Sequence, residues 1–490
     1  MRRIFLLAFA GFLLLAGAWA GALPANGTYD ESQHIVRAYA AVDGQWRPHG
    51  PNRQSYKIPA TLLPSDPECM RESDDPKPAT CLVARPSSPA EVSVETYVAR
   101  YNPVYYLAVG LPLKLSPDLT GIVMSRLLSA LLCALMLGAS VWLAVLAGRR
   151  LLAAAVVLVA TPMVVNLAGS LNPNGMEICA AVLLFTSLLC REAHRTALVW
   201  AGVAAFALIT VRHIGPVLIV IDLAAVALFV GVWALRRDLR GWLGGGVLAG
   251  LVVFGAWVLA ARSPVGAGPG SASDLGVGGI VRGLFAHRFE FYIKQIVGQF
   301  GYGETTISPL AILYWYGLVA VIVVPALWFA TWRARSVIVG LVAAGFGMLV
   351  ALEFYFVPKA NWFSHGRYAL PILVGAVLIA AFVLDGQPFA TRLPSRLPRW
   401  LPRWLPVILV AATAPVHLYA LVRVLSRYRV NIETSFSPFG GGWSPPVNAS
   451  VVLLSLLVGV GLLVWTTLPV TDSDETGTDI RDSTRTVPAD

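Results

Sequence analysis

Long apolar runs recur along almost the whole 490-residue chain, and short arginine clusters separate them. Most runs reach the roughly 17–25 residues that an α-helix needs to cross a bilayer. Inside lipid a backbone must satisfy its own hydrogen-bonding groups, which a helix does within one segment. Charged residues make up only 13% of the sequence, about half the fraction in a soluble domain. The sequence therefore predicts an all-α polytopic integral membrane protein.

The basic residues orient the predicted helices. The net charge is +10, which in a soluble protein would suggest a nucleic-acid partner. Here the clusters lie between apolar runs, as at Arg149–Arg150 and Arg236–Arg237, where positive charge keeps a loop in the cytoplasm. We expect membrane lipids as partners, no nucleic acid, and both termini in the cytoplasm.

Apolar length and flanking charge predict about twelve transmembrane helices. A first helix or signal anchor occupies residues 1–23, and the later spans cover 121–147, 151–169, 174–190, 196–211, 216–235, 242–261, 308–330, 336–356, 368–384, 404–424 and 448–468. The predicted parts are an extracytoplasmic loop with interfacial helices (24–119), a transmembrane domain (120–468) and a disordered cytoplasmic tail (469–490).

Three features leave alternatives open. Ala18-Trp19-Ala20 resembles a signal-peptide cleavage site, although the apolar run before it is long enough for a retained helix, which we expect. Residues 102–115 are apolar but too short to span, and 279–300 are amphipathic; both fit helices at the membrane surface. Arg423, Arg427 and Arg429 fall outside in this arrangement, so either the last two spans are misplaced or these arginines have a local function.

Two of the five cysteines, Cys69 and Cys81, lie in the polar loop after the first helix. In an oxidising compartment such a pair forms a disulfide. The alternative is two free thiols, so the disulfide prediction depends on the predicted topology.

The stretch from Thr28 to Tyr39 follows the first helix directly. With Asp30 and Glu31 in a first turn, helical spacing puts Asp30, His34 and Arg37 on one face. A carboxylate pair beside a histidine and an arginine fits a general base next to a phosphate contact. Acidic residues at a helix start are also ordinary capping residues, and this reading competes with the catalytic one.

Four short sequence pieces, in order over residues 1 to about 385, resemble the GT-C superfamily of membrane glycosyltransferases. They resemble more closely a bacterial family of predicted membrane proteins, domain of unknown function 2142. The pieces are Asp30-Glu31 with His34, Arg37-Ala38-Tyr39 and Gly44; Asn102-Pro103-Val104-Tyr105-Tyr106; Ser170-Leu171-Asn172-Pro173-Asn174 with Glu177; and His365-Gly366-Arg367-Tyr368 with Leu370-Pro371. The pattern leads us to expect an aspartate near position 174, where this chain has Asn174, so a metal or acceptor role at that position is in doubt.

The resemblance implies a GT-C-like fold in a bacterial inner membrane and transfer of a sugar from a polyprenyl-phosphate donor. The acceptor would be an envelope glycan, lipid or protein. By position, Asp30 is the base that deprotonates the acceptor, with Glu31 as helper or as ligand of a divalent metal. The donor phosphate calls for cationic and polar partners. The candidates on the same outer side are His34, Arg37, Arg212, His213, Lys359, His365, Arg367 and Tyr368.

A second hypothesis is a lipid or polymer transporter, or a non-catalytic envelope-assembly protein. Transporters carry ionisable residues near the bilayer midplane. Here the suggestive charges cluster at the outer boundary; Glu353 and Asp222 are the nearest exceptions, and Asp222 lies inside a predicted span. An essential Asp222 with a dispensable Asp30 would favour transport.

Overall fold

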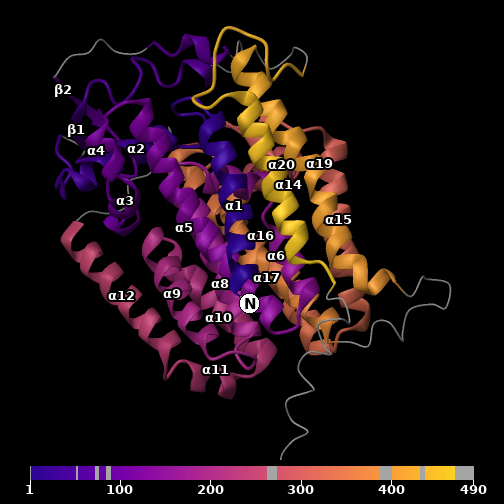
Figure 1. Cartoon of the computed structure of the whole chain (residues 1–490). Helices are drawn as coiled ribbons and strands as arrows, with labels where there is room; N and C mark the ends of the chain where they lie inside the picture. The colour runs from indigo at the N-terminus through magenta and orange to yellow at the C-terminus, as the bar shows by residue number, and fades with distance from the viewer. Residues whose placement is uncertain are drawn as a thin grey trace, which may run out of the picture.

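The computed structural model describes residues 2–50, 53–71, 77–83, 90–261, 273–386, 400–430 and 436–469. All of the predicted cytoplasmic tail beyond residue 469 lies outside the described residues. The chain forms a bundle of long helices with a polar region at one end, and Figure 1 shows that region, which carries β1 and β2, far from α11.

Eight helices in the described part of the chain are long and apolar enough to cross a membrane. They are α1 (Arg2–Ala22), α5 (Leu119–Leu146), α12 (Trp242–Ala261), α15 (Pro309–Phe329), α16 (Trp332–Ala360), η4 with α17 (Gly366–Ala369 and Leu370–Asp385), α19 (Leu401–Arg429) and α20 (Ala449–Thr466). The chain is thus a multi-pass membrane protein.

The remaining predicted spans form shorter or broken helices. The predicted span 151–169 is a pair, α6 (Arg150–Val159) and α7 (Pro162–Ala168), bent by 72°. Three apolar helices have 16 or 17 residues: α8 (Pro173–Leu189), α9 (Thr196–Val211) and α10 (Gly215–Val230). The predicted span 216–235 ends early, because a separate short helix, α11 (Val232–Asp238), follows α10. Among the described residues, eight of the predicted spans are therefore long single helices and the others are shorter or broken.

The polar region contains strands that the all-α prediction did not include. Strands β1 (Ser55–Pro59) and β2 (Glu91–Glu95) pair antiparallel, with Ser55 opposite Glu95. Around them lie α2 (Glu31–Val42), α3 (Pro103–Val109) and α4 (Leu111–Leu115). The predicted interfacial helix over 102–115 is thus two short helices, and Asn102 caps the first by accepting a hydrogen bond from Val104 N at 3.0 Å.

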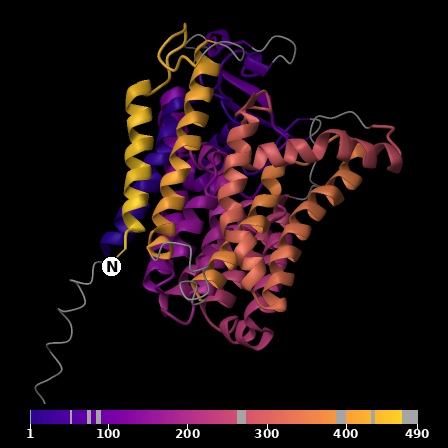
Figure 2. The same cartoon turned by 90° about the vertical axis from the view of Figure 1, so that its right-hand side faces the viewer.

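The predicted amphipathic segment over 279–300 is helical in three parts. They are α13 (Val277–Gly283), a π-helical turn (Leu284–Arg288) and α14 (Phe289–Val297), followed by a short pairing of β3 (Gln299–Phe300) with β4 (Thr305–Thr306). In Figure 2 this segment, salmon in colour, runs across the bundle rather than along it. Ile280 and Leu284 are buried beneath it, whereas Phe285 is 76% exposed.

The first and last helices of the chain pack against each other. Gly11 of α1 and Gly459 of α20 meet so closely that a Cβ added at Gly459 would lie 2.8 Å from the carbonyl oxygen of Gly11. Small residues permit this close approach of backbones, which is how membrane helices gain packing energy without a hydrophobic driving force. α1 also packs along α5, so the N-terminal helix lies inside the bundle.

A buried ion pair joins α2 to the bundle. Arg126 of α5 donates to both carboxylate oxygens of Glu31, at 2.7 and 2.6 Å, and both side chains are fully buried. The same guanidinium donates to the carbonyl oxygens of Ala20, Leu23 and Pro24. Those carbonyls lie at the end of α1, where a helix leaves acceptors unsatisfied. One arginine therefore caps α1 and fixes the start of α2.

We predict that Arg126→Met lowers the free energy of unfolding by about 3–5 kcal/mol, because it leaves the Glu31 carboxylate buried without a counter-charge. Thermal unfolding of the purified protein in detergent measures this loss. The double variant Glu31→Leu, Arg126→Met removes both charges and should be less destabilised than the single variant. A single variant as stable as the wild type would show that the pair does not hold α2.

Candidate functional site

A cavity of about 380 Å³ lies between the polar region and the helical bundle. Residues from seven separate parts of the chain form its wall. They are Asp30, Gln33, His34, Glu68, Arg71, Tyr97, Val98, Tyr101, Asn174, Arg212, Tyr302, Ala360, Trp362, Phe363, His365 and Tyr368. The wall combines aromatic rings with a few charged groups, a composition typical of a small-molecule site.

Asp30 lies at the start of α2 with an unusual backbone conformation. Its φ is +59° and its ψ +10°, in the left-handed region, which non-glycine residues seldom adopt and which often marks a functional position. Its side chain makes no hydrogen bond that caps α2 within the described chain. The carboxylate is turned away from the helix, so the ordinary capping reading of this aspartate does not hold.

The Asp30 carboxylate has two partners of different kinds. Arg367 donates from Nη2 to Oδ2 at 2.7 Å, and the Tyr97 hydroxyl donates to Oδ1 at 2.5 Å. The Asp30 backbone N–H donates to the hydroxyl of Tyr302 at 2.7 Å. An ionised carboxylate has about four acceptor positions. These contacts fix the orientation of the group and leave acceptor capacity on its 18% exposed side chain.

Arg367 is held in place by its neighbours on several elements. It is fully buried, it lies over the ring of Tyr29 at 4.1 Å, and its Nε donates to Oδ1 of Asn174 at 3.3 Å. The preceding residue must be glycine, because a Cβ at position 366 would lie 2.3 Å from the carbonyl oxygen of Tyr292. The close approach of η4 to α14 thus sets the position of Arg367.

Asn174 continues this polar chain into the bundle. Its amide donates to Oε2 of Glu177 at 3.1 Å, and Arg212 donates to the same oxygen at 2.9 Å. The Arg212 guanidinium lies over the ring of Tyr368 at 4.5 Å. An aspartate at position 174 would place a second carboxylate against Glu177, so the asparagine fits its surroundings.

The four sequence pieces noted above come together around Asp30. His34 Nδ1 lies 2.8 Å from the hydroxyl of Tyr106, and Asn172 donates to the carbonyl oxygen of Tyr29 at 2.8 Å. Arg367 adds hydrogen bonds to Asp30 and Asn174. The bond between Arg367 and Asp30 joins residues that are 337 positions apart in the sequence.

Charge at the site is set by burial and by Arg367. Burial by itself would raise the pKa of Asp30, but the Arg367 guanidinium, His365 and the Tyr97 hydrogen bond together lower it to about 2. Burial lowers the pKa of His34 to about 3, and burial with Arg367 holds the pKa of His365 well below its ordinary value. At neutral pH Asp30 is therefore ionised and both histidines are neutral.

The predicted site residues divide into two groups by position. Those that line the cavity or contact Asp30 are Asp30, His34, Arg212, His365, Arg367 and Tyr368. Those placed elsewhere among the described residues are Glu31, Arg37, His213 and Lys359. Glu31 is occupied by Arg126, and its other contact is Leu171 N at 3.2 Å.

The other three displaced residues pack against aromatic rings. Arg37 is buried, donates to the carbonyl oxygen of Tyr101 at 3.0 Å and lies over the rings of Tyr56, Tyr106 and Trp257. His213 lies edge-on to Tyr101, and Lys359 lies over the ring of Tyr355. Their contacts are those of packing residues.

Several cavity residues were absent from the sequence prediction. Tyr97, Tyr302 and the pair Glu68 and Arg71 reach the cavity from loops that are remote from Asp30 in the sequence. Glu68 directly precedes Cys69, and Arg71 follows it by two residues. The predicted disulfide was therefore the local sequence signal that this segment is held in a defined position.

No three histidine, cysteine, aspartate or glutamate side chains gather into a metal-binding group anywhere in the described residues. Asp30 and Glu31 point to different partners, Arg367 and Arg126. The two neighbouring carboxylates therefore face different parts of the structure.

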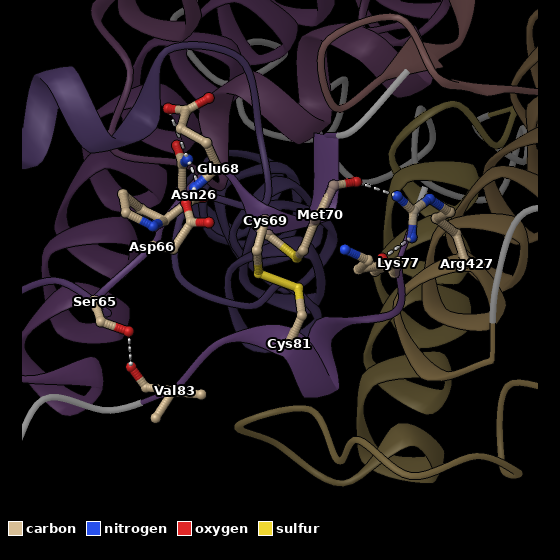
Figure 3. Close-up of a disulfide and its surroundings, with 11 residues drawn as sticks. Asn26, Ser65, Asp66, Glu68, Cys69, Met70, Lys77, Cys81, Val83 and Arg427 are labelled. Carbon is tan, nitrogen blue, oxygen red and sulfur yellow. Dashed lines mark hydrogen bonds between the residues drawn. A yellow bond between two sulfur atoms is a disulfide. The ribbon is translucent and has the colours of Figure 1, made fainter. Parts of the chain in front are cut away.

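Cys69 and Cys81 are joined in a disulfide, as Figure 3 shows. It connects two short 3₁₀ helices, η1 (Cys69–Arg71) and η2 (Ala79–Cys81). Arg427, near the end of α19, donates to the carbonyl oxygens of Met70 at 2.6 Å and Lys77 at 2.7 Å (Figure 3). Arg427, one of the three arginines for which the sequence left a local function open, thus binds the disulfide loop.

A model of the DUF2142 family, described as a predicted membrane protein, matches residues 12–376. No curated protein matches the chain. Two solved structures of ArnT from Cupriavidus metallidurans are similar to it, each with a TM-score of 0.42. The apo structure has 15% identity and covers 92% of this chain and 75% of ArnT; the structure bound to undecaprenyl phosphate has 17% identity and covers 94% and 77%.

We predict that the contribution of Asp30 to stability is lost in acid. Its pKa of about 2 in the folded protein is below the ordinary value of 3.8, so the contribution is complete above about pH 4 and disappears as the pH falls toward 2. The difference in unfolding temperature between wild type and Asp30→Asn should be equal at pH 7 and pH 5 and smaller at pH 3. Asp43→Asn, at the end of the same helix, is the control. A difference that changes between pH 7 and pH 5 would contradict the assignment.

Proposed function

This chain belongs to the DUF2142 family of predicted membrane proteins, and we propose that it is a membrane glycosyltransferase. It would transfer a sugar from a polyprenyl-phosphate donor to an acceptor hydroxyl of the cell envelope. The acceptor class is an envelope glycan, lipid or protein. The single observation that carries the proposal is the Asp30 carboxylate, oriented by Arg367 and Tyr97 at the wall of the cavity.

The position of the cavity supports an outer-leaflet reaction. It lies beside the disulfide loop, and disulfides form in oxidising compartments outside the cytoplasm. The basic helix α11 is at the far end of the molecule in Figure 1, where the positive-inside rule puts the cytoplasm. This orientation would place both termini in the cytoplasm of a bacterial inner membrane and the cavity at the level of the outer headgroups.

Asp30 is suited to receive the proton of the acceptor. In glycosyl transfer the acceptor oxygen bonds to the anomeric carbon while the bond from that carbon to the phosphate oxygen breaks, through a state with oxocarbenium character. The hydroxyl proton becomes acidic as the new bond forms, so a weak but ionised carboxylate can accept it at that stage. The proton passes to Asp30, and the electron pair of the broken bond leaves with the phosphate.

Arg212 is suited to bind the leaving phosphate. It lines the cavity with its side chain 10% exposed, and Glu177 and Tyr368 fix its guanidinium. Arginine binds phosphate oxygens through paired N–H groups. His34 and His365 also line the cavity, but they are neutral at pH 7 and would serve as hydrogen-bonding rather than charged partners.

Transport is the second candidate, and one observation favours it. Asp222 lies in the apolar helix α10, is fully buried, and has no hydrogen-bond partner for either carboxylate oxygen among the described residues. Such buried carboxyls occur in proton and ion pathways. Asp222 is not part of the cavity wall, so loss of function in Asp222→Asn with full function in Asp30→Asn would favour transport over transfer.

We predict that Asp30→Asn lowers sugar transfer by at least about 100-fold, because the amide cannot accept the proton. The assay is mass spectrometry of envelope glycans and of polyprenyl-phosphate sugars in a deletion strain that carries the wild type or a variant. The deletion strain and Asp30→Asn should both accumulate the donor and lack one envelope sugar.

Asp43→Asn is the matched control, because Asp43 ends the same helix and pairs with Lys114 at 3.0 Å away from the cavity wall. It should restore the envelope sugar fully. An Asp30→Asn strain with a normal glycan profile, at equal protein level in the membrane, would remove Asp30 from catalysis.

A further inference from the structure

We propose that Arg71 is a second phosphate-binding residue of the cavity and that the Cys69–Cys81 disulfide holds it in position. The ligand class is the phosphate of a polyprenyl-linked donor, so this inference rests on the proposed function. It adds a substrate contact that lies outside the four family-like sequence pieces. It also makes substrate binding depend on the Cys69–Cys81 disulfide.

The surroundings of Arg71 are those of a binding residue. Its side chain is 10% exposed and lines the cavity. The guanidinium lies over the ring of Tyr302, and its Nη1 pairs with Glu68. Its Nη2 is buried and has no acceptor among the described residues. A buried N–H without an acceptor is destabilising, and a phosphate oxygen in the cavity would supply the missing acceptor.

Arg71 is also coupled to the catalytic candidate. The Tyr302 hydroxyl below its guanidinium accepts the Asp30 backbone N–H at 2.7 Å. A phosphate bound at Arg71 would therefore lie on the same side of the cavity as the carboxylate. The donor phosphate leaves as the acceptor hydroxyl attacks and gives its proton to Asp30. The residue that binds the phosphate must therefore be near Asp30, and Arg71 is linked to Asp30 through Tyr302.

The charge distribution in the cavity assigns the phosphate to arginines. The histidines on the wall are neutral at pH 7, and Arg367 is enclosed between Asp30, Tyr29 and Asn174. Among the described wall residues the permanently charged cations are Arg71 and Arg212. They come from different elements, the disulfide loop and the end of α9, so a phosphate between them would join the polar region to the bundle.

The disulfide fixes the segment that carries Arg71. Arg71 ends η1, two residues after Cys69, and Arg427 binds the adjacent carbonyl of Met70 (Figure 3). Asn26 holds the preceding residues through the Pro67 carbonyl at 2.7 Å. Opening the disulfide would free one side of η1, and Arg71 would lose its fixed approach to the cavity.

The test measures binding of a polyprenyl phosphate and of the matching uncharged polyprenol to the full-length purified protein in detergent. The wild type should prefer the phosphate. Arg71→Gln should weaken phosphate binding by about tenfold, the loss expected for one charge-assisted contact, and leave polyprenol binding unchanged. Arg71→Lys should recover part of the loss. Arg53→Gln, an exposed arginine of the same polar region, is the matched control and should bind like the wild type.

The disulfide is tested with the same probes. Cys69→Ser, Cys81→Ser should weaken phosphate binding about as much as Arg71→Gln, and adding Arg71→Gln should weaken it little further, since both act on one contact. A reductant should reproduce the loss in the wild type and have no effect on the cysteine variant.

The outcomes separate the two proposals. A wild type that binds polyprenol and polyprenyl phosphate equally would overturn the proposed function and this inference together. A wild type that prefers the phosphate, with Arg71→Gln unchanged, would overturn only the role of Arg71. If phosphate binding is weakened in Arg71→Gln but unchanged in the double cysteine variant, the proposal that the disulfide positions Arg71 would be overturned.

Discussion

The buried pair of Glu31 and Arg126 is the interaction on which the site depends. Both side chains are fully enclosed, and the guanidinium binds the last carbonyls of α1 as well as the carboxylate. A pair taken so far out of water gains little net stability from its Coulomb attraction alone. Its effect is positional, because it sets the end of α1, the start of α2 and, through Leu171 N, the loop before α8. Asp30 is the residue immediately before the anchored glutamate.

Adjacent acidic residues here have opposite surroundings. Glu31 points into the bundle and has a permanent partner from α5, whereas Asp30, in a left-handed conformation, points to the cavity and keeps part of its surface open. The change of backbone conformation between them turns the two side chains apart. Glu31 is therefore a structural anchor, whereas Asp30 is a group of the cavity wall.

The sequence was informative where function and structure use local patterns. Apolar length located the long helices. The family-like pieces contained Asp30, His34, His365, Arg367 and Tyr368, which lie at or beside the cavity, and Arg212 was predicted from its place at the outer end of a span. It was less informative where contacts join distant segments. Tyr97 and Tyr302 reach Asp30 across 67 and 272 residues. The spacing of Glu31 and Arg37 fits a catalytic pattern. In the fold, however, Glu31 pairs with Arg126 and Arg37 binds the carbonyl of Tyr101, and helical spacing does not reveal either partner.

The packing of α1 against α20 bears on how the protein is made. A ribosome delivers α1 to the membrane long before α20 exists, and the glycine faces at Gly11 and Gly459 can meet only after the last helix has inserted. The hydrogen bonds from Arg427 to the disulfide loop also form late, because α19 is synthesised near the end of the chain. Bundle closure and completion of the outer loop therefore belong to the end of biogenesis, and a chain that ended before residue 400 would lack both the α1–α20 contact and the hydrogen bonds from Arg427 to the disulfide loop.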